Sequence, residues 1–244
     1  MIVYGRNPVF EALRGRRKHA VKEVWATTGA AREPWLAGAK PRIVSGEEIE
    51  RRCGSSAHQG ICADAGAYPY DSATRLLALD SPLIVALDQI QDPQNLGSIC
   101  RTAECAGVAG VVIPERRAAE VTPAVCKASA GAVEHLPIAR VRNVADFLAD
   151  ARKADCWCYG ASAGGQAGGR RPVPYDSPDY AGSGVVLVLG SEGEGLRPRV
   201  AKACDELIAL PLLGRIESLN VSAAAAALLY EILQRRSAGL DNSP

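Results

Sequence analysis

Two hydrophobic patterns predict the secondary structure of most of the chain. Continuous apolar runs at residues 83–87, 111–113 and 185–188 are typical of strands buried on both faces of a parallel sheet. Between these runs, apolar residues recur with helical spacing. The clearest such helix begins at Asn95, which is expected to cap it, and its inward stripe consists of Leu96, Ile99, Cys100, Ala103 and Ala106. The alternation of strands and helices predicts an α/β fold with a mostly parallel sheet covered on both faces.

The first part of the chain has shorter elements with recognisable helix starts. Asn7 is expected to cap a helix with Pro8 at its first position, and Ser45 with Glu48 forms a capping box for a second helix. Short strands are predicted at residues 21–25, 43–44 and 59–63.

These patterns predict two domains joined by a linker. A segment rich in Pro, Ala, Asp and Ser, with little apolar periodicity, precedes the first continuous apolar run. We therefore expect a small α/β domain at residues 1–70, a linker at residues 71–82 and a larger parallel-sheet domain at residues 83–244.

A glycine-rich stretch at residues 189–196, here called the glycine loop, follows one of the buried strands. Its glycines allow tight bends and a close approach to a ligand. Glu192 and Glu194 would repel a phosphate, and the loop matches no phosphate-binding template, so a cationic or neutral ligand fits better. A plain turn between a strand and a helix explains the loop equally well. The loops after Leu87, Leu189 and Leu210 are three strand carboxyl ends, where such sheets bind ligands.

Composition narrows the class of protein. The formal net charge is +1, which argues against nucleic-acid binding through bulk electrostatics. The densest basic run contains Arg14, Arg16, Arg17 and Lys18, and a solvated helix end explains such a run more often than RNA does. No run is long enough for a membrane helix, and the start of the sequence lacks the apolar core of a signal peptide. We expect a cytoplasmic enzyme with no membrane partner.

The eight cysteines lie mostly in apolar segments, and no C-x-x-C pair or His/Cys cluster has zinc spacing. Buried thiols are therefore favoured over disulfides, and no metal is expected.

Three segments together resemble a known family. Asn95 with Arg101, the run Gly190-Ser191-Glu192-Gly193 and residues 218–222 match in order and spacing the motifs of the SpoU/TrmH family of RNA ribose 2′-O-methyltransferases, in the SPOUT superfamily. The resemblance covers about residues 83–236. Residues 3–9 and His58-Gln59-Gly60 extend it and look like the branch that methylates a guanosine of large-subunit ribosomal RNA.

This resemblance implies a fold, a cofactor and partners. The family threads its C-terminal segment into a deep trefoil knot, which no sequence pattern predicts because knots are rare. It also implies an N-terminal RNA-binding domain, S-adenosyl-L-methionine as the methyl donor, an RNA substrate and a homodimer in which the partner subunit lies next to each cofactor site. The cofactor contacts of the family correspond here to Gly190, Leu210 and Leu219. Simple core packing is the alternative interpretation of both leucines.

The polar active-site positions of the family correspond here to Asn95, Arg101, Glu192, Ser218 and Asn220. The planar guanidinium of Arg101 suits phosphate binding and orientation of the ribose hydroxyl first, and proton removal second, because a guanidinium holds its own proton too strongly to act easily as a base. Glu192 is expected to hold Arg101 and Asn95 in place. Asn220 is expected to cap the last helix while its amide binds Glu192 or the cofactor loop; helix capping alone explains it nearly as well.

Three other functions stay open. A transfer-RNA ribose 2′-O-methyltransferase and a resistance-type ribosomal RNA methylase would use the same motifs. A non-catalytic, ribosome-associated RNA-binding protein would have no reason to retain all five polar positions. A nucleotide-dependent oxidoreductase is disfavoured because its glycine order is different.

Overall fold

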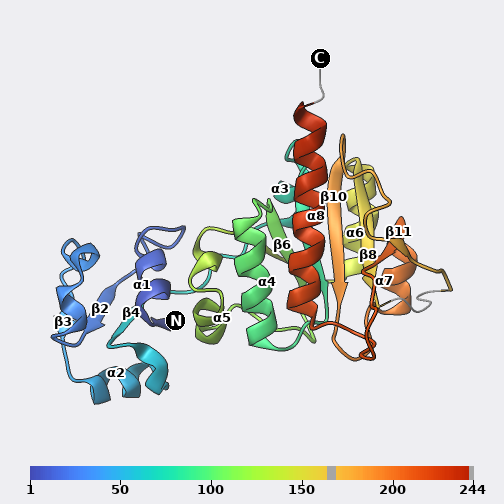
Figure 1. The fold of residues 1–244 in the computed structure, drawn as a ribbon. Helices are drawn as coiled ribbons and strands as arrows, with labels where there is room; N and C mark the ends of the chain where they lie inside the picture. Colours follow the sequence, from blue (N-terminus) through green and yellow to red (C-terminus); the bar gives the residue numbers. More distant parts are fainter. Residues whose placement is uncertain (164–168, 242–244) are drawn as a thin grey trace.

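The computed structural model describes residues 1–163 and 169–241, and it contains two separate sheets. The first sheet has the strand order β1-β4-β2-β3. Its strands are β1 (Ile2–Tyr4), β2 (Glu23–Ala26), β3 (Arg42–Ile43) and β4 (Ile61–Asp64). Its helices are α1 (Arg6–Ala12) and α2 (Gly46–Cys53), with short 3-10 turns at η1 (Ala30–Arg32), η2 (Pro34–Leu36) and η3 (Ser56–His58). We call this part, from β1 to β4, the N-terminal unit (Figure 1).

Two helix starts in the N-terminal unit test the capping predictions. The expected Asn7 cap is wrong: Gly5 precedes α1 with φ +93°, the helix begins at Arg6, and Pro8 is its third residue. A glycine in this conformation starts the helix two residues earlier than a side-chain cap at Asn7 would. The Ser45 cap of α2 is confirmed, since its hydroxyl accepts a hydrogen bond from the Glu48 backbone N–H at 3.2 Å.

The second sheet has seven strands in the order β7-β6-β5-β10-β8-β11-β9, and all its strand pairings are parallel. The strands are β5 (Leu83–Asp88), β6 (Gly110–Pro114), β7 (Ile138–Val141), β8 (Cys156–Ser162), β9 (Val173–Pro174), β10 (Gly184–Gly190) and β11 (Glu206–Ala209). This part, from β5 to the last helix, is the C-terminal unit. The predicted α/β fold with a parallel sheet is confirmed.

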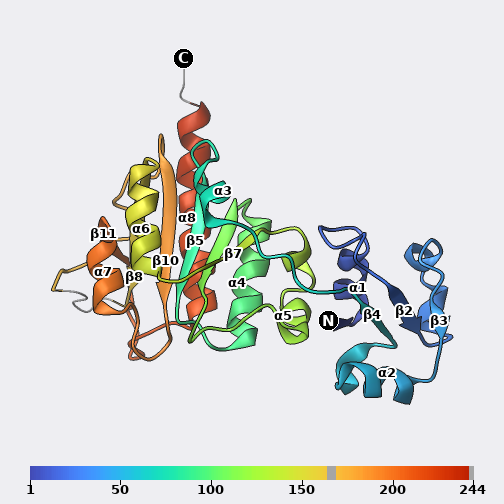
Figure 2. The ribbon, with the colours of Figure 1, turned by 180° about the vertical axis from the view of Figure 1, so that it is seen from behind.

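Helices cover both faces of the second sheet. Figures 1 and 2 show α4 (Pro93–Cys105) and α8 (Val221–Asp241) side by side on one face, with α6 (Val144–Lys153) and α7 (Pro198–Ala203) on the other. Alternate residues of β5 face the two layers: Val85 and Leu87 pack with α4 and α8, while Ile84 packs with α6 and α7. All six residues of β5 are buried, which explains its continuous apolar run.

The start of α4 differs from the prediction. Asp92 caps the helix by accepting a hydrogen bond from the Gln94 N–H at 2.9 Å, and Pro93 is the first helical residue. Asn95 therefore lies inside the first turn, and its side chain is free for another role. The predicted inward stripe of α4 is confirmed, because all five of its residues are buried.

The two units share one hydrophobic core. The short helix α5 (Pro123–Ala128) and the 3-10 turn η4 (Ala132–Glu134) lie between α1 and α4 (Figure 1). Val3 and Val9 of the N-terminal unit belong to the same buried cluster as Val125 and Val133 of this segment. The connecting chain contains one short helix, α3 (Ala73–Leu77).

The basic run near the end of α1 is solvated except at Arg17: Arg14, Arg16 and Lys18 are exposed, as expected for a solvated helix end. The Arg17 side chain is 1% exposed and pairs with Glu134, and Arg16 pairs with Asp71. Six of the eight cysteines are buried, whereas Cys105 is exposed on the outer side of α4. None of the described helices is long and apolar enough to cross a lipid bilayer.

Candidate active site

A cavity of about 580 Å³ opens at the carboxyl edge of the second sheet. Its walls are the glycine loop after β10, the segment after β11 and the first turns of α8. The three residues predicted to hold a cofactor line this cavity, namely Gly190, Leu210 and Leu219. Two of the predicted polar residues, Glu192 and Ser218, line it as well.

The glycine loop folds back on itself at the mouth of this cavity. The backbone of Ser191 exchanges two hydrogen bonds with that of Gly195, at 3.2 and 2.9 Å. A Cβ atom at Gly190 would overlap the Gly195 carbonyl group, so only glycine permits this close approach. The loop therefore presents main-chain groups and two glutamates to whatever occupies the cavity.

An ion pair with a buried carboxylate anchors the end of the glycine loop to the neighbouring strand. The Asp88 side chain, at the end of β5, is 0% exposed and accepts hydrogen bonds from the Arg197 backbone N–H at 3.0 Å and from Arg197 Nε at 2.8 Å. The sequence interpretation missed this pair. Its signal was a carboxylate that directly follows a fully apolar strand, since a buried charge needs a partner.

Three motif segments meet through a chain of side-chain hydrogen bonds. The Asn95 amide donates to Glu192 Oε1, and the Asn220 amide donates to Asn95 Oδ1 at 3.1 Å. The oxygen of Asn220 accepts from the Ser222 backbone N–H at 2.9 Å, so the predicted cap of α8 is confirmed. The expected bond from Asn220 to Glu192 is replaced by one to Asn95, because Asn95 lies between them. Asn95 is buried, which fixes the geometry of the chain.

Arg101 lies apart from this chain. It is six residues beyond Asn95, or about 9 Å along the helix axis. Its side chain is exposed, does not line the cavity, and has no hydrogen bond or ion pair with any residue that the structure describes. The predicted contact with Glu192 is therefore wrong for the single chain. An unpaired, exposed guanidinium remains available for a phosphate or for a second subunit.

The charges around the cavity favour a cation. Glu192, Glu194 and Glu217 line it, whereas neither lysine nor arginine occurs among its described lining residues. Apolar side chains, including Leu210, Leu212 and Leu228, supply the remaining walls. Carboxylates near an apolar pocket of this size suit a ligand with a positive centre and a flat apolar surface, and S-adenosylmethionine has both.

Comparison with known proteins identifies the family. The model described as the SpoU rRNA Methylase family matches residues 82–230, more than half of the chain. The chain belongs to this SpoU family. A second family model, described as RNA 2′-O ribose methyltransferase substrate binding, matches residues 2–71.

Relatives and solved structures agree with this assignment. A Bacillus subtilis protein named as a TrmH family tRNA/rRNA methyltransferase, YacO, is 35% identical over 247 residues, covering 96% of each chain. The AdoMet-bound rRNA methyltransferase of Sinorhizobium meliloti has a TM-score of 0.75 at 26% identity, covering 96% of this chain and 86% of its own. The SpoU methyltransferase AviRb of Streptomyces viridochromogenes has a TM-score of 0.77 at 25% identity, covering 98% and 90%.

These likenesses confirm the predicted family and fold class. SpoU methyltransferases are trefoil-knot proteins, so the C-terminal unit of this SpoU protein has the fold that the motif resemblance implied. Family membership also makes the protein an RNA methyltransferase of the tRNA/rRNA class.

Proposed function

We propose that this SpoU methyltransferase transfers a methyl group from S-adenosylmethionine to a ribose 2′-hydroxyl, and that its target is a guanosine of large-subunit ribosomal RNA. The observation that carries the methyl-transfer site is the hydrogen-bonded chain Glu192-Asn95-Asn220 at the edge of the acidic cavity. This chain joins the three loops that contain the family motifs.

The residues of the candidate active site have distinct roles in the proposed reaction. When bound, S-adenosylmethionine would supply an electrophilic methyl group: its methyl carbon–sulfur bond would break as the bond to the 2′-oxygen forms, S-adenosylhomocysteine would leave, and the hydroxyl proton would pass to water. Main-chain groups near Gly190, Leu210 and Leu219 bind the donor, and nearby carboxylates favour its positive charge. Asn95 holds Glu192 in one orientation at the cavity mouth. Arg101 binds the target phosphate and orients the hydroxyl; aligned reacting groups can lower a barrier by roughly 7–11 kcal/mol.

We also propose that residues 1–70 bind the RNA substrate. The family model that matches residues 2–71 supports this role by its description. Exposed basic side chains occur in this part, including Arg14, Lys18 and Arg51. A transfer RNA is the alternative substrate, since the name of the Bacillus subtilis relative covers both RNA classes.

A homodimer is the proposed assembly. Beside the cavity, Leu213 is 97% exposed, Ile216 77% and Leu219 50%, and Tyr230 on α8 is 51% exposed. Large apolar side chains grouped beside a functional site favour a protein contact. Since α4, which contains Arg101, packs against α8, a second copy placed on α8 would lie next to the helix of Arg101. Analytical ultracentrifugation tests this, and a monomer at micromolar concentration contradicts it.

The proposed function has a direct test. Purified protein is incubated with S-adenosylmethionine carrying a labelled methyl group and, separately, with unmodified large-subunit rRNA, small-subunit rRNA and bulk tRNA. We expect label in large-subunit rRNA at one guanosine, mapped by resistance of the adjacent phosphodiester to alkali. Label only in tRNA supports the alternative substrate. Label on a base instead of a ribose, or no label in any RNA, refutes the proposal.

A further inference from the structure

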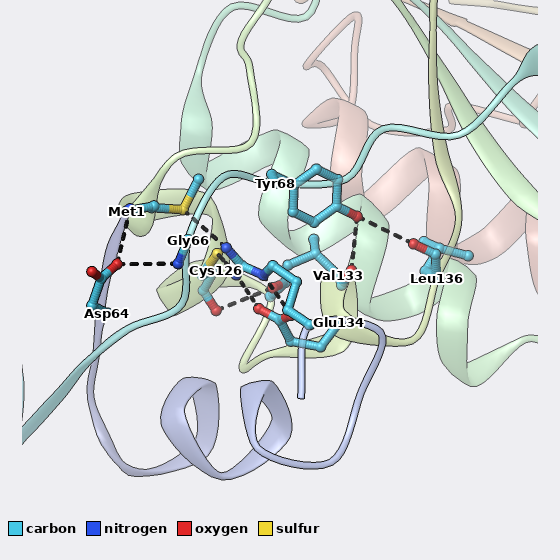
Figure 3. Close-up of polar contacts among 10 residues, drawn as sticks. Met1, Asp64, Gly66, Tyr68, Cys126, Val133, Glu134 and Leu136 are labelled. Atoms are coloured by element: carbon cyan, nitrogen blue, oxygen red, sulfur yellow. Dashed lines mark hydrogen bonds and ion pairs between the residues drawn. The ribbon is translucent and has the colours of Figure 1, made fainter. Parts of the chain in front are cut away.

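Arg17 is a cation of the N-terminal unit that lies completely inside the protein. It follows α1, and its partner Glu134 ends η4 in the C-terminal unit. The Arg17 side chain is 1% exposed and that of Glu134 is 0% exposed. Arg17 Nε lies 2.9 Å from Glu134 Oε2, and Arg17 Nη2 also bonds Oε1, so the pair is bidentate (Figure 3). Bidentate arginine–carboxylate pairs fix relative orientation as well as distance.

The surroundings of the pair offer no substitute partner of equal strength. Arg17 Nη2 lies 3.6 Å from Cys126 Sγ and Nη1 lies 3.5 Å from Met1 Sδ, both weak acceptors (Figure 3). The Tyr68 ring centre is 5.4 Å from the guanidinium carbon. Burial alone would lower the pKa of Arg17, but the hydrogen bond and charge of Glu134 outweigh burial and raise it. Arg17 is therefore charged, and removal of Glu134 would leave an uncompensated buried cation.

Neighbouring contacts define the same interface. The Arg16 N–H donates to the Glu134 carbonyl at 2.8 Å. The Tyr68 hydroxyl donates to the Val133 carbonyl at 2.8 Å, as Figure 3 shows. A Cβ atom at Gly15 would lie 2.5 Å from the Glu134 carbonyl oxygen. The two backbones therefore approach more closely than any residue other than glycine at position 15 would permit. Such close, directional contacts allow one relative orientation of the two units.

The segment that receives Arg17 also supports the helix with the candidate catalytic residues. α5 and η4 both pack against α4, and a Cβ atom at Gly97 of α4 would overlap Ala128 of α5. Asn95 and Arg101 lie on α4, on either side of Gly97. A shift of the N-terminal unit on α5 and η4 would therefore change the distance between bound RNA and the methyl-transfer site.

We propose that Arg17 and Glu134 are positioning residues that lock the N-terminal unit onto the C-terminal unit, so that RNA held by the former reaches the cavity in one geometry. This inference rests on the proposed function for its effect on methylation, and on the contacts alone for the lock itself. A buried ion pair adds little net stability compared with an apolar pair, but it imposes direction. Loss of this ion pair is therefore expected to affect RNA methylation more than folding stability.

The test compares two variants of the full-length protein with a matched control. Glu134→Gln removes the charge from the lock. The double variant Arg17→Met with Glu134→Leu fills the space with apolar groups and avoids an unpaired charge if the single variant folds poorly. Lys153→Met is the control, because it removes an exposed ion pair with Asp150 on the far face of the sheet. Small-angle X-ray scattering reports the separation of the units, and steady-state methylation gives KM for RNA and kcat.

We expect the double variant to keep the melting temperature and S-adenosylmethionine affinity of the wild type. Its distribution of distances between the units should broaden, and kcat/KM for RNA should fall about tenfold to a hundredfold, mainly through KM, since two linked binding surfaces lose effective concentration when their relative orientation is no longer fixed. Glu134→Gln should show the same change, and Lys153→Met none. A double variant with wild-type scattering and wild-type KM overturns the proposal, as does a loss of cofactor affinity equal to the loss of RNA methylation. If the wild type methylates no RNA, the proposed function fails. The scattering measurement then tests the role of the ion pair by itself, and an unchanged separation of the units in both variants overturns that role.

Discussion

Asn95 connects the three motif segments of the candidate site, because its one amide group makes two long-range hydrogen bonds. Its nitrogen donates to Glu192, 97 residues away, and its oxygen accepts from Asn220, 125 residues away. An uncharged amide can donate from its nitrogen and accept at its oxygen at the same time. A carboxylate at this position would repel Glu192, and an apolar residue would leave both partners without this link.

Asn95→Ala tests this connection. We expect the free energy of unfolding to fall by about 0.5–1.5 kcal/mol, the net value of a hydrogen bond, because exposed Glu192 and Asn220 regain water as a partner. Methyl transfer should fall more, by about a hundredfold, since Glu192 loses its fixed orientation. Chemical denaturation and single-turnover methylation measure the two effects. A loss of turnover no larger than the loss of folded protein would limit Asn95 to a structural role.

Arg101→Ala tests the exposed arginine of α4. Stability should change by less than about 0.5 kcal/mol, since the side chain has no partner among the described residues and alanine is the better helix former. Turnover should fall by a factor of about 10² to 10³, the effect of losing a preorganised charged contact to the transition state. Arg101→Lys should recover little, because lysine lacks the planar fork.

Single-turnover methyl transfer at saturating RNA and cofactor, with thermal melting alongside, measures both Arg101 variants. Cofactor affinity serves as the internal control and should be unchanged, because Arg101 does not line the cavity. Near wild-type turnover in Arg101→Ala would remove Arg101 from the proposed mechanism.

At the scale of elements, the glycine loop obtains its shape from both of its ends. The exchange of hydrogen bonds between Ser191 and Gly195 closes the loop, and the ion pair of Arg197 with buried Asp88 ties its exit to β5. Since β5 and β10 are adjacent parallel strands, the loop is fixed relative to α4, which follows β5. Because both ends of the glycine loop are fixed in this way, Glu192 is held beside Asn95.

Gly190→Ala tests the shape of the loop, with Gly193→Ala as the matched control. A Cβ at Gly190 would overlap Gly195 backbone, whereas a Cβ at Gly193 would meet nothing within 4 Å. We expect the first variant to lose about 1–3 kcal/mol of stability, as overpacked sites do, and the second to melt like the wild type without ligand. Calorimetric titration should show weaker binding of S-adenosylmethionine to Gly190→Ala. Equal melting temperatures and equal affinity in Gly190→Ala and the wild type would contradict the loop geometry.

At the scale of the whole molecule, buried thiols lie in both large hydrophobic clusters: Cys100 and Cys126 in the cluster that spans the two units, and Cys204 in the cluster on the other face of the second sheet. Burial raises the pKa of Cys126 to about 11 and those of Cys100 and Cys204 to about 12, from an ordinary value of 9.0. These groups stay neutral in the folded protein over most of the alkaline range.

These raised pKa values predict alkaline destabilisation. Below about pH 9 the thiols are neutral in both states, so their contribution to stability is fully present. As the pH rises from 9 toward the folded pKa values, only the unfolded chain ionises, and the free energy of unfolding falls. Urea denaturation between about pH 8 and about pH 11 measures this trend. A free energy of unfolding that stays constant or rises across this range would show that the thiols are not protected by burial.

Local patterns determined much of the structure. Apolar runs predicted strands β5, β6 and β10, because strands buried on both faces need apolar residues at every position. The helical spacing predicted the buried stripe of α4, and short-range chemistry predicted the caps at Ser45 and Asn220. The motif spacing placed Gly190, Leu210 and Leu219 on what proved to be one cavity.

Only the tertiary structure decided which distant side chains meet. The basic run gave no sign that Arg17 is buried against Glu134, 117 residues away, because sequence spacing does not specify long-range partners. Asn95 was expected to cap α4, but Asp92 with Pro93 satisfies the helix start and leaves Asn95 for Glu192. Arg101 lies outside the hydrogen-bonded chain for a geometric reason, since six helical residues carry it about 9 Å along the helix from Asn95. The motifs determined the chemistry available, and the packing of the two units determined where each group can act.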